Sequence, residues 1–359
     1  MGEGAVPKEN DAMAKGKSGA IRAAVAGLGR AGWDIHVAAM RGRKDFVISD
    51  VVDLEQGRLA EAKAEFGCRT YKDWKRFLRE SDAELVVVAT QSKDHAPMTI
   101  EALRAGMHVV VEKPMATNLR DAERMMAAAK ATGRLLTINQ SARFARDFLH
   151  IREVIKSGVL GKVFFVRRGG YGFQRRRDWQ TLSKYGGGQL NNTAVHMVDQ
   201  ICQLLDSPAK DVFGDLQQLI NPGDVEDHVK VVVRGESGMV VEVESTMVCA
   251  LPLPAWVVMG SRGTLVSDGR TSQLRYTEAK KLPPVKPIDS HVVASRRYGF
   301  GEVIKFVEET VPSVGTSKKN YYDYLYDSVR KGKPLFVTPE SVRQTMWVLQ
   351  QARKGTEFA

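Results

Sequence analysis

Short apolar runs alternate with longer segments of helical periodicity in the first part of the chain, beginning at Ile21. Two of these runs, ELVVVAT and MHVVVE, are rich in Val and suit strands that are buried on both faces. The predicted strands cover 21–26, 46–53, 84–90, 107–112 and 135–139, and the predicted helices cover 55–66, 96–105 and 119–132, with one more ending near Arg41. Strands that alternate with helices predict a doubly wound parallel sheet.

The pattern changes after about Ser141. A helix at 147–157 precedes strands at 162–168, 229–234, 239–248 and 255–260, and no helices alternate with them. The Gly-flanked segment 235–238 predicts a hairpin in a mainly antiparallel sheet. The Pro-rich stretch 283–287 predicts a surface loop, and helices return at 301–310, 321–331 and 339–354.

Two domains and a tail follow from these patterns and from a length of 359 residues. Residues 1–20 lack periodicity and predict a disordered tail. We expect a Rossmann domain at 21–140 and an α+β domain at 141–359, whose last helix could pack back on the Rossmann domain. The expected class is therefore α/β, with a parallel sheet followed by a mixed, mainly antiparallel one.

Composition indicates the class of protein and its cellular location. The chain is 43% hydrophobic and 26% charged, as in soluble globular proteins, and it holds no apolar run of about 18 residues, so we expect no membrane span. The first residues lack the apolar core of a secretory signal. The 3 cysteines show no CxxC pair and no zinc-ligand spacing, which predicts no metal site and a cytoplasmic location.

The basic excess of the chain is spread over its folded body. The 53 basic and 42 acidic residues give a net charge of +11, and the densest basic patch holds Arg167, Arg168 and Arg175 to Arg177. Such a patch could bind phosphate or nucleic acid, but no nucleic-acid-binding motif accompanies it, and a sheet edge or subunit interface explains it without a ligand. We expect no nucleic-acid partner. The charge also hints at an acidic substrate.

The segment Gly27-Leu28-Gly29-Arg30-Ala31-Gly32 is a GxGxxG motif between the first strand and the first helix. Its glycines permit a tight turn, close approach of a pyrophosphate and close packing of helix on strand. Asp53 ends the second predicted strand, 21 residues after Gly32, where a carboxylate can bind the ribose hydroxyls of NAD and repel the 2′-phosphate of NADP. The alternative for Asp53 is a helix N-cap. The motif predicts NAD as cofactor, in preference to NADP.

Glu112, Lys113 and Pro114 close a strand at the edge where an open parallel sheet binds its ligands. Lys113 could hold a substrate oxygen during hydride transfer, with Glu112 as its orienting partner, although a surface ion pair is an equal alternative. Thr90 and His95 follow the 84–90 strand and could line the same cofactor cleft. His95 could instead cap the next helix.

A run of three glycines, Gly186 to Gly188, precedes Asn192, His196 and Asp199. The spacing of the last three predicts one face of a helix. His196 could take a hydroxyl proton while the carbon loses hydride, because the usual pKa of His is close to neutral pH. A structural role is the alternative for a single His.

GxGxxG, the strand-terminal EKP at 112–114 and GGGx7H at 186–196 together resemble the glucose-fructose oxidoreductase, inositol dehydrogenase and rhizopine-catabolism family (Gfo/Idh/MocA). The resemblance implies an NAD(P)-binding Rossmann domain followed by an open-faced mixed sheet for substrate binding and oligomerisation, assembled as a homodimer or homotetramer. It implies sugar or cyclitol substrates, Lys113 at substrate and nicotinamide, and His196 as the acid/base. It also implies a cis bond before Pro114.

Three more assignments rest on the same resemblance. Many members carry Asp where this chain has Asn192, which can bind a sugar hydroxyl but cannot relay a proton. Arg143 lies where relatives often place a basic residue near the substrate, and Trp179 resembles part of an active-site lid. An interface contact is an equal alternative for Arg143 and Trp179.

The leading hypothesis is an NAD-dependent oxidoreductase that acts on a secondary alcohol of a sugar or cyclitol. The alternative is a redox-neutral NAD-dependent glycosidase or lyase that works through a transient keto-sugar. A third hypothesis is a cofactor-binding regulator without catalytic activity.

Overall fold

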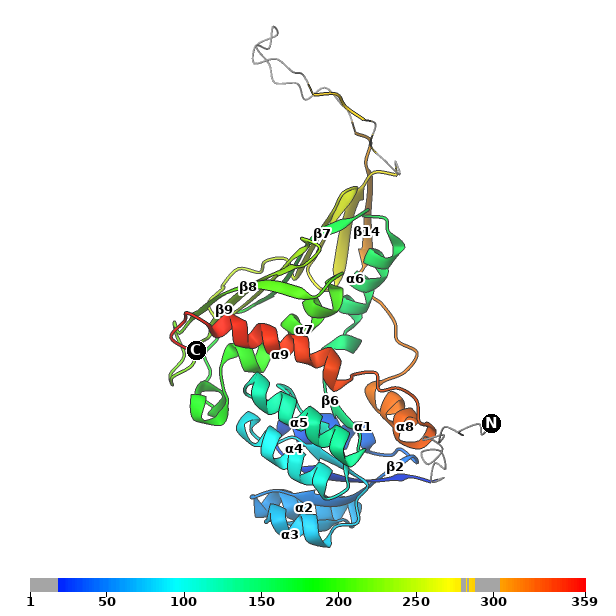
Figure 1. Ribbon diagram of the computed structural model, residues 1–359, viewed down its shortest axis with the longest axis vertical. Coiled ribbons are helices and arrows are strands. Elements are labelled where there is room, and N and C mark those ends of the chain that lie inside the picture. The colour runs from blue at the N-terminus through cyan, green and yellow to red at the C-terminus, as the bar shows by residue number, and fades with distance from the viewer. Residues whose placement is uncertain (1–18, 279–281, 283, 288–303) are drawn as a thin grey trace, which may run out of the picture.

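The computed structural model of the chain describes residues 19–278, 282, 284–287 and 304–359. Two sheets lie one above the other along the longest axis of the molecule (Figure 1). Residues 1–18 of the expected tail lie outside the described residues. Among the helices of the described ranges, none has both the length and the apolar character needed to cross a membrane.

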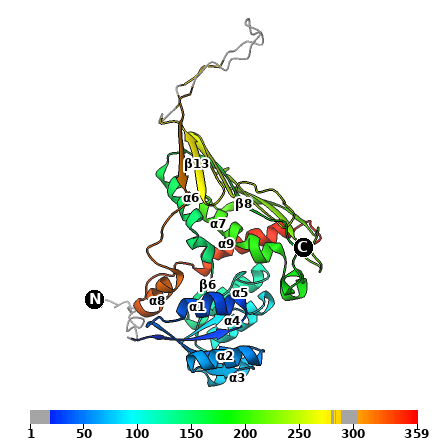
Figure 2. The ribbon, with the colours of Figure 1, turned by 180° about the vertical axis from the view of Figure 1, so that it is seen from behind.

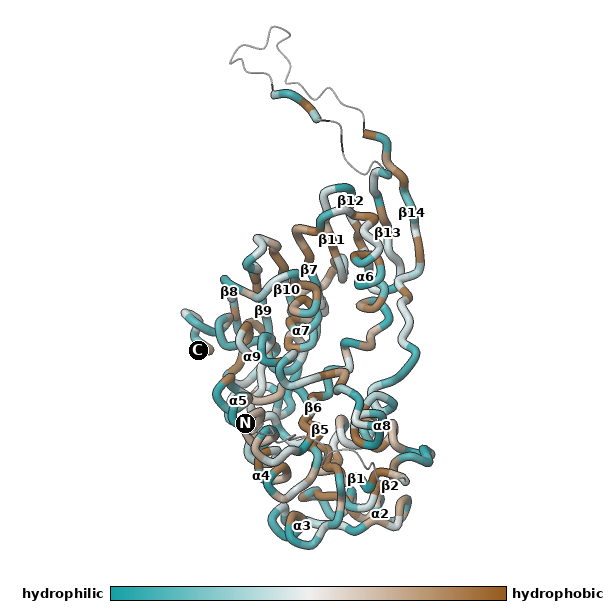
Figure 3. The backbone as a smooth tube through the Cα atoms, turned by 45° about the vertical axis from the view of Figure 1, so that its right-hand side comes forward, coloured by the Kyte–Doolittle hydropathy of each residue, from teal (hydrophilic) through white to brown (hydrophobic). Residues whose placement is uncertain are grey.

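The first sheet has six parallel strands in the order β3-β2-β1-β4-β5-β6, which confirms the predicted doubly wound arrangement. Its strands are β1 (Ile21–Ala26), β2 (Phe46–Val52), β3 (Arg69–Tyr71), β4 (Leu85–Val88), β5 (His108–Val111) and β6 (Leu136–Ile138). All four residues of β4 are fully buried, because helices cover both faces of the sheet. Hydrophobic segments accordingly follow β5 and β6 (Figure 3).

Local capping fixes the ends of several helices in this domain. The helices are α2 (Gln56–Phe66), α3 (Trp74–Glu80), α4 (His95–Arg104) and α5 (Leu119–Thr132). The side chain of Asn118 accepts a hydrogen bond from Asp121 N at the start of α5, and Gly133 ends it with a φ of 63°. These signals explain why the prediction of 119–132 matches α5.

The sequence prediction missed β3 and α3, and it assumed a regular first helix. β3 has only three residues, and Arg69 at its start is exposed, so no periodic pattern marks it. The helix that follows β1 begins as a π-helical segment, η1 (Ala31–Val37), and continues as α1 (Ala38–Met40). π-helical turns are rare and occur often at functional sites.

The second sheet has eight strands in the order β14-β13-β12-β11-β7-β10-β9-β8. Among the strands of the described residues, only β7 and β10 pair in parallel in this sheet. The predicted mixed, mainly antiparallel sheet is therefore confirmed, as is the hairpin of β9 and β10. The strands are β7 (Val163–Tyr171), β8 (Ala209–Gln217), β9 (His228–Gly235), β10 (Val240–Thr246), β11 (Trp256–Gly260), β12 (Gly263–Ser267), β13 (Thr271–Tyr276) and β14 (Val307–Pro312). Helices α6 (Arg146–Ser157) and α7 (Val195–Leu204) lie against one face.

The helix expected at 301–310 is wrong where the structure describes it. Residues 301–303 lie outside the described residues, and 307–312 form β14, which pairs antiparallel with β13. Pairing with a neighbouring strand overrides a local helical preference here. Of the expected 283–287 loop, residues 284–287 have no regular secondary structure, and Pro283 lies outside the described residues.

The last two helices connect the two sheets. α8 (Tyr321–Lys331) packs on the first sheet, where the Tyr322 ring lies 5.3 Å from that of Phe46 in an edge-to-face contact. α9 (Pro339–Arg353) contacts α5 and β6 on one side and β8 and α7 on the other (Figure 2). One apolar core therefore runs from the first sheet through α9 to the second.

Candidate active site

The glycine-rich loop joins β1 to η1 and combines tight packing with one open position. A Cβ at Gly27, whose φ is 89°, would lie 2.6 Å from Ala89 O, and one at Gly32 would lie 1.8 Å from Gly27 O. A Cβ at Gly29 would meet nothing within 4 Å. Backbone contacts thus explain Gly27 and Gly32, whereas Gly29 borders open space that a pyrophosphate can approach. Within the same motif, Arg30 is exposed and Ala31 is half-buried.

Asp53 directly follows β2 and is held beside this loop. Its Oδ2 accepts a hydrogen bond from Leu28 N at 2.6 Å, and its Oδ1 accepts one from Glu55 N at 2.8 Å. The N-cap of α2 is Glu55, so Asp53 is not that cap. Arg58 Nη1 lies 3.5 Å from Asp53 Oδ2. The site thus offers a carboxylate for ribose hydroxyls, with one cation beside it.

Lys113 extends from the carboxyl edge of the first sheet to the second domain. The Lys113–Pro114 peptide bond is cis, as the resemblance implies. Lys113 Nζ donates a hydrogen bond of 2.7 Å to Asn192 O. Burial lowers the pKa of Lys113, the charge of Glu112 opposes this shift, and the charges of Arg30 and Arg176 add to it. The ammonium group therefore lies at the junction of the two domains.

His95 contacts the backbone of this segment and helps to hold it in place. Its Nδ1 is 2.7 Å from Pro114 O, and its Nε2 is 3.2 Å from Thr90 O. The ring is almost fully buried, at 1% exposure, and burial lowers the pKa of His95. Thr90 is half-buried and follows β4 by two residues. The structure thus places His95 between two backbone carbonyls of the cleft, which suits a positioning role.

Glu112 belongs to a buried network that the sequence analysis missed. Its Oε1 accepts hydrogen bonds from His36 Nε2 at 2.9 Å and from Asn139 Nδ2 at 2.6 Å, and its Oε2 accepts one from Lys113 N at 3.1 Å. His36 Nδ1 in turn lies 2.7 Å from the Tyr322 hydroxyl. Burial acts against the charge of Glu112, but the hydrogen bonds from His36 and Asn139 and the charge of Lys113 lower its pKa to about 2. An ionised carboxylate is thus fixed directly behind Lys113.

The glycine run brings the start of the His196 helix against the first domain. A Cβ at Gly186, whose φ is 74°, would lie 2.7 Å from Thr117 Cγ2, and one at Gly188 would lie 2.5 Å from Glu226 Oε1. The run is followed by a π-helical segment, η6 (Leu190–Ala194), and then by α7. His196 and Asp199 therefore share the regular helix α7, as their spacing predicts, whereas Asn192 lies in the π-helical segment before it.

His196 and Asn192 lie close to Lys113. Asn192 binds Lys113 through its backbone oxygen, while its amide Nδ2 donates to Gln180 O at 3.3 Å. Burial, followed by the charge of Lys113, lowers the pKa of His196 to about 3. Within the described residues, His196 Nδ1 is buried and has no hydrogen-bond partner. His196 is therefore a neutral imidazole at pH 7, in a form that can accept a proton.

Arg143 and Trp179 occupy different surroundings. Arg143 is 4% exposed and forms a two-pronged ion pair with Asp199, with N···O distances of 2.7 and 2.8 Å, and it also donates to Ser341 Oγ at 2.9 Å. Trp179 is half-buried at the start of a short turn, η4 (Trp179–Thr181). Gln180 O of that turn accepts hydrogen bonds from Gly188 N and from the Asn192 amide, so the Trp179 segment adjoins the His196 helix.

A cavity of about 420 Å³ opens beside His196, between the domain junction and the second sheet. Its walls include Ser141, Ala142, Arg168, Thr193, His196 and Gln200. Gln140, which follows β6 at the same edge, is fully buried, and its amide has no hydrogen-bond partner within the described residues. The open space at Gly29 and these unpaired polar groups fit a dinucleotide and a polar substrate.

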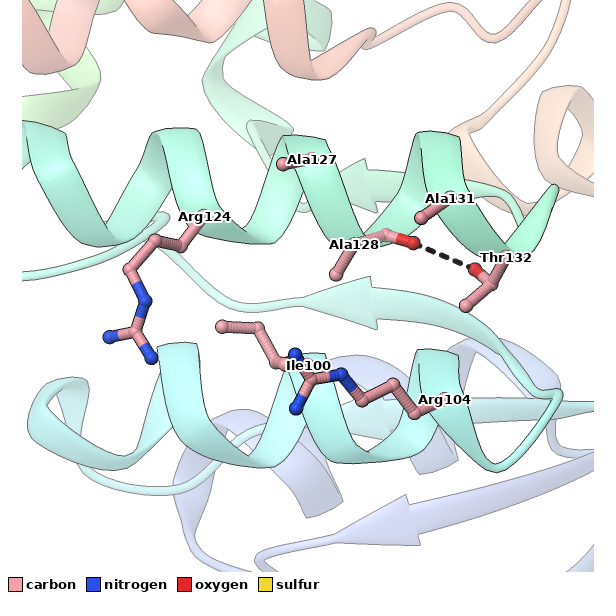
Figure 4. A pocket seen from close by; sticks show the side chains of 7 residues that line it. All are labelled: Ile100, Arg104, Arg124, Ala127, Ala128, Ala131 and Thr132. Carbon is pink, nitrogen blue, oxygen red and sulfur yellow. Dashed lines mark hydrogen bonds between the residues drawn. The ribbon is translucent and has the colours of Figure 1, made fainter.

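Another hollow, of about 330 Å³, lies away from this edge. Its walls include Ile100, Arg104, Arg124 and Ala128, between α4 and α5 (Figure 4). Arg104 ends α4, and the two helices run back from the carboxyl edge of the sheet, so this hollow belongs to the opposite end of the domain. Among the residues that the structure describes, no three His, Cys, Asp or Glu side chains gather as a metal site would require.

Acid is expected to destabilise the fold through groups of this site. The pKa of His196 falls from 6.5 to about 3 on folding, so the unfolded chain binds this proton first, and the free energy of unfolding decreases as the pH falls from about 6.5 towards 3. Glu112, with a pKa lowered from 4.5 to about 2, loses its contribution below pH 4.5. Urea denaturation at pH 7.5 and 5.0 measures the His196 effect.

His196→Asn is the control variant for this effect, because it removes the titrating ring. Its loss of stability between pH 7.5 and 5.0 should be smaller than that of the unchanged protein. Equal losses in the two proteins would contradict the lowered pKa of His196.

Comparisons with known proteins agree with this arrangement. Residues 21–140 match the model of the oxidoreductase family with an NAD-binding Rossmann fold, and residues 148–266 match the GFO/IDH/MocA C-terminal domain. A myo-inositol 2-dehydrogenase of Thermotoga maritima is 27% identical over 347 residues, which cover 94% of this chain and 96% of that protein. The NADP-dependent scyllo-inositol 2-dehydrogenase IolW of Bacillus subtilis is 24% identical over 94% of each chain.

A solved structure supports the same fold. The WlbA dehydrogenase of Bordetella pertussis, crystallised with NADH and UDP-GlcNAcA, superposes with a TM-score of 0.74 at 21% identity, covering 94% of this chain and 98% of that one. The two family models cover the first sheet and the second sheet as far as residue 266, and the glycine loop, Lys113 and His196 fall in the matched ranges. The chain therefore belongs to the Gfo/Idh/MocA family of oxidoreductases, with an NAD-binding Rossmann domain.

Proposed function

We propose that the chain is an NAD-dependent dehydrogenase that oxidises a secondary alcohol of a sugar or cyclitol, or reduces the matching ketone. The observation that carries this proposal is the hydrogen bond from Lys113 Nζ to Asn192 O, four residues before His196. His196 lines the 420 Å³ cavity and lies within reach of the Lys113 charge. The inositol dehydrogenases among the relatives support the substrate class. Which cyclitol or sugar is bound depends on the cavity walls.

Each residue of the site has a separate role in the proposed reaction. When bound, the nicotinamide supplies the hydride acceptor. His196 takes the hydroxyl proton as a neutral imidazole, and Lys113 donates a hydrogen bond to the same oxygen and stabilises its negative charge. Asn192 binds without transferring a proton, because an amide cannot relay one. One hydride and one proton leave the CH–OH group, so the step balances.

Supporting residues hold these groups in place. Glu112 lies behind Lys113 and compensates its charge, while His95 supports the Pro114 carbonyl. Arg143 positions α7 through Asp199, which makes it a positioning residue rather than a direct substrate ligand. Trp179 adjoins the helix start and remains a predicted substrate contact.

NAD is the favoured cofactor because of Asp53. Its carboxylate suits the two ribose hydroxyls and repels a 2′-phosphate. Asp53→Ala is expected to change the ratio of NAD to NADP affinity by about 10- to 100-fold towards NADP, since charged hydrogen bonds are lost and Arg58 loses its partner. Fluorescence titration with NADH and NADPH measures this ratio.

Arg58 provides the control for that prediction. Adding Arg58→Ala to Asp53→Ala should remove most of the gained NADPH affinity, because the neighbouring cation is then absent. An unchanged ratio in Asp53→Ala would mean that Asp53 does not contact the ribose.

The function itself is tested by denaturing the purified protein and assaying the released nicotinamide nucleotide. Absorbance at 340 nm is then followed with NAD and a panel of sugars and cyclitols. Net NADH formation supports the dehydrogenase. Bound NAD with product release but no net NADH would replace it by a redox-neutral glycosidase or lyase, and bound NAD without any reaction would indicate a regulator. Failure to bind any nicotinamide nucleotide would contradict the proposal as a whole.

The assembly as a homodimer or homotetramer and the cytoplasmic location remain predictions. Light scattering of the purified protein measures the first of these directly.

A further inference from the structure

Arg168 belongs to the wall of the cavity that holds His196, whereas its neighbour Arg167 does not. The two residues follow each other in β7, so their side chains lie on opposite faces of the second sheet. Arg167 pairs with Glu242 at 3.1 Å and with Glu244 at 3.5 Å on one face. Arg168 lies on the face covered by α7 and lines the cavity.

Within the described residues, only some of the N–H donors of the Arg168 guanidinium have hydrogen-bond partners. Its Nη1 donates to Gly169 O at 2.7 Å and to Ala255 O at 3.2 Å, and its Nε donates to Gln200 Oε1 at 3.2 Å. Within the described residues, Nη2 has only an ion-pair partner, Asp147 Oδ2 at 3.7 Å, which is too far for a hydrogen bond. Two N–H donors of this cation thus remain for a ligand.

The surroundings of Arg168 desolvate its charge, and the charge of Asp147 offsets this only in part. Its side chain is 17% exposed, and its guanidinium carbon lies 4.6 Å from the ring centre of the buried Trp256. Burial lowers the pKa of Arg168 for the same reason. A bound anion would offset this desolvation, because opposite charges attract more strongly away from water.

The carboxylates of the neighbouring cleft are committed to other groups. Asp199 binds Arg143, and Glu112 accepts hydrogen bonds from buried donors. The charges of Arg30 and of Arg176, which is itself paired with Asp178, also act on Lys113. The cleft and the cavity together therefore favour a negatively charged ligand.

We propose that the substrate carries an acidic group, a carboxylate or a phosphate, which Arg168 binds while the reacting hydroxyl lies at His196. The inference rests on the proposed function and narrows its substrate class to acidic polyols. The planar guanidinium matches both kinds of oxyanion. Ser141 and Thr193, whose hydroxyls have no hydrogen-bond partner in the part of the chain that the structure describes, are available to the polyol hydroxyls.

Binding of three related probes tests this inference. The protein is first saturated with NADH and then titrated calorimetrically with D-glucose, D-glucuronate and D-glucose 6-phosphate. At least one of the acids should bind about tenfold or more tightly than glucose, since one charge-assisted hydrogen bond is worth about that much. The acid that binds more tightly shows whether the site prefers a carboxylate or a phosphate.

Variants then assign the effect to Arg168. Arg168→Gln should weaken binding of the preferred acid by about 10- to 100-fold and leave glucose within about threefold. Arg167→Gln, on the opposite face of the same strand, should change neither. Comparison of Ser141→Asp with Ser141→Asn gives a second test that keeps Arg168 intact, and only the Asp variant should weaken binding of the acid through charge.

The outcomes separate the two proposals. Lack of NADH binding contradicts the proposed function and is established before any probe is added. If NADH binds, the inference is overturned by glucose binding as tightly as both acids, by neither acid binding, or by equal losses for acid and glucose in Arg168→Gln.

Discussion

Lys113→Met lowers kcat for the sugar or cyclitol substrate by about 100- to 1000-fold, the usual loss when one donor to a developing oxyanion is removed. Methionine keeps the length and the packing of the side chain but removes the ammonium that lies 2.7 Å from Asn192 O. The NADH dissociation constant should stay within about threefold, because the glycine loop and Asp53 are unchanged. Steady-state kinetics and NADH titration measure the two quantities.

The pH dependence gives the same prediction a second readout. Burial lowers the pKa of Lys113 from 10.5, so the ammonium is lost as the pH rises, and kcat/KM of the unchanged enzyme should fall at a pH below 10.5. Lys75→Met is a matched control, since it removes an exposed ion pair with Glu101 far from the cleft. Normal turnover of Lys113→Met would contradict the role assigned to Lys113.

The regular part of the fold was predictable because its signals are local. α5 has an N-cap residue, an amphipathic body and a glycine at its end. β4 is apolar throughout, and β5 has three valines after His108. β14 carried no such signal. Its sequence Val-Glu-Glu-Thr-Val-Pro has the helix-compatible residues Glu308 and Glu309, and only pairing with β13 makes it a strand.

In the candidate site, too, some residues could be predicted from the sequence and others could not. Gly27, Gly29, Asp53 and Lys113 could be proposed from motifs, because each follows a strand at the edge where ligands bind. The residues that hold these groups in place could not be proposed from the sequence. Tyr322 reaches Glu112 through His36, and these contacts join residues far apart in the sequence.

Arg143 and Arg168 show how partners decide the role of a charge. Both were noted as basic residues in the sequence, but Arg143 is bonded through both prongs to Asp199, whereas Arg168 has its ion-pair partner only at 3.7 Å. The sequence shows that an arginine is present, but the carboxylates around that arginine determine whether its N–H donors remain available to a ligand. The π-helical segment η6 was not predictable either, and it places Asn192 outside the regular helix that holds His196 and Asp199.

His196→Asn is expected to lower kcat by about 100- to 10,000-fold at pH 7, because it removes the proton acceptor but keeps a polar side chain. The pKa of His196, lowered to about 3, leaves the ring neutral from pH 5 to 8, so its protonation should not reduce kcat/KM of the unchanged enzyme over that range. In the variant the residual rate should rise with pH as hydroxide replaces the missing base. His228→Asn, on β9, is the matched control and should retain activity. A pH profile that is unchanged in shape and height in His196→Asn would show that another group takes the proton, and the neutral imidazole beside Lys113 would then have only a structural role.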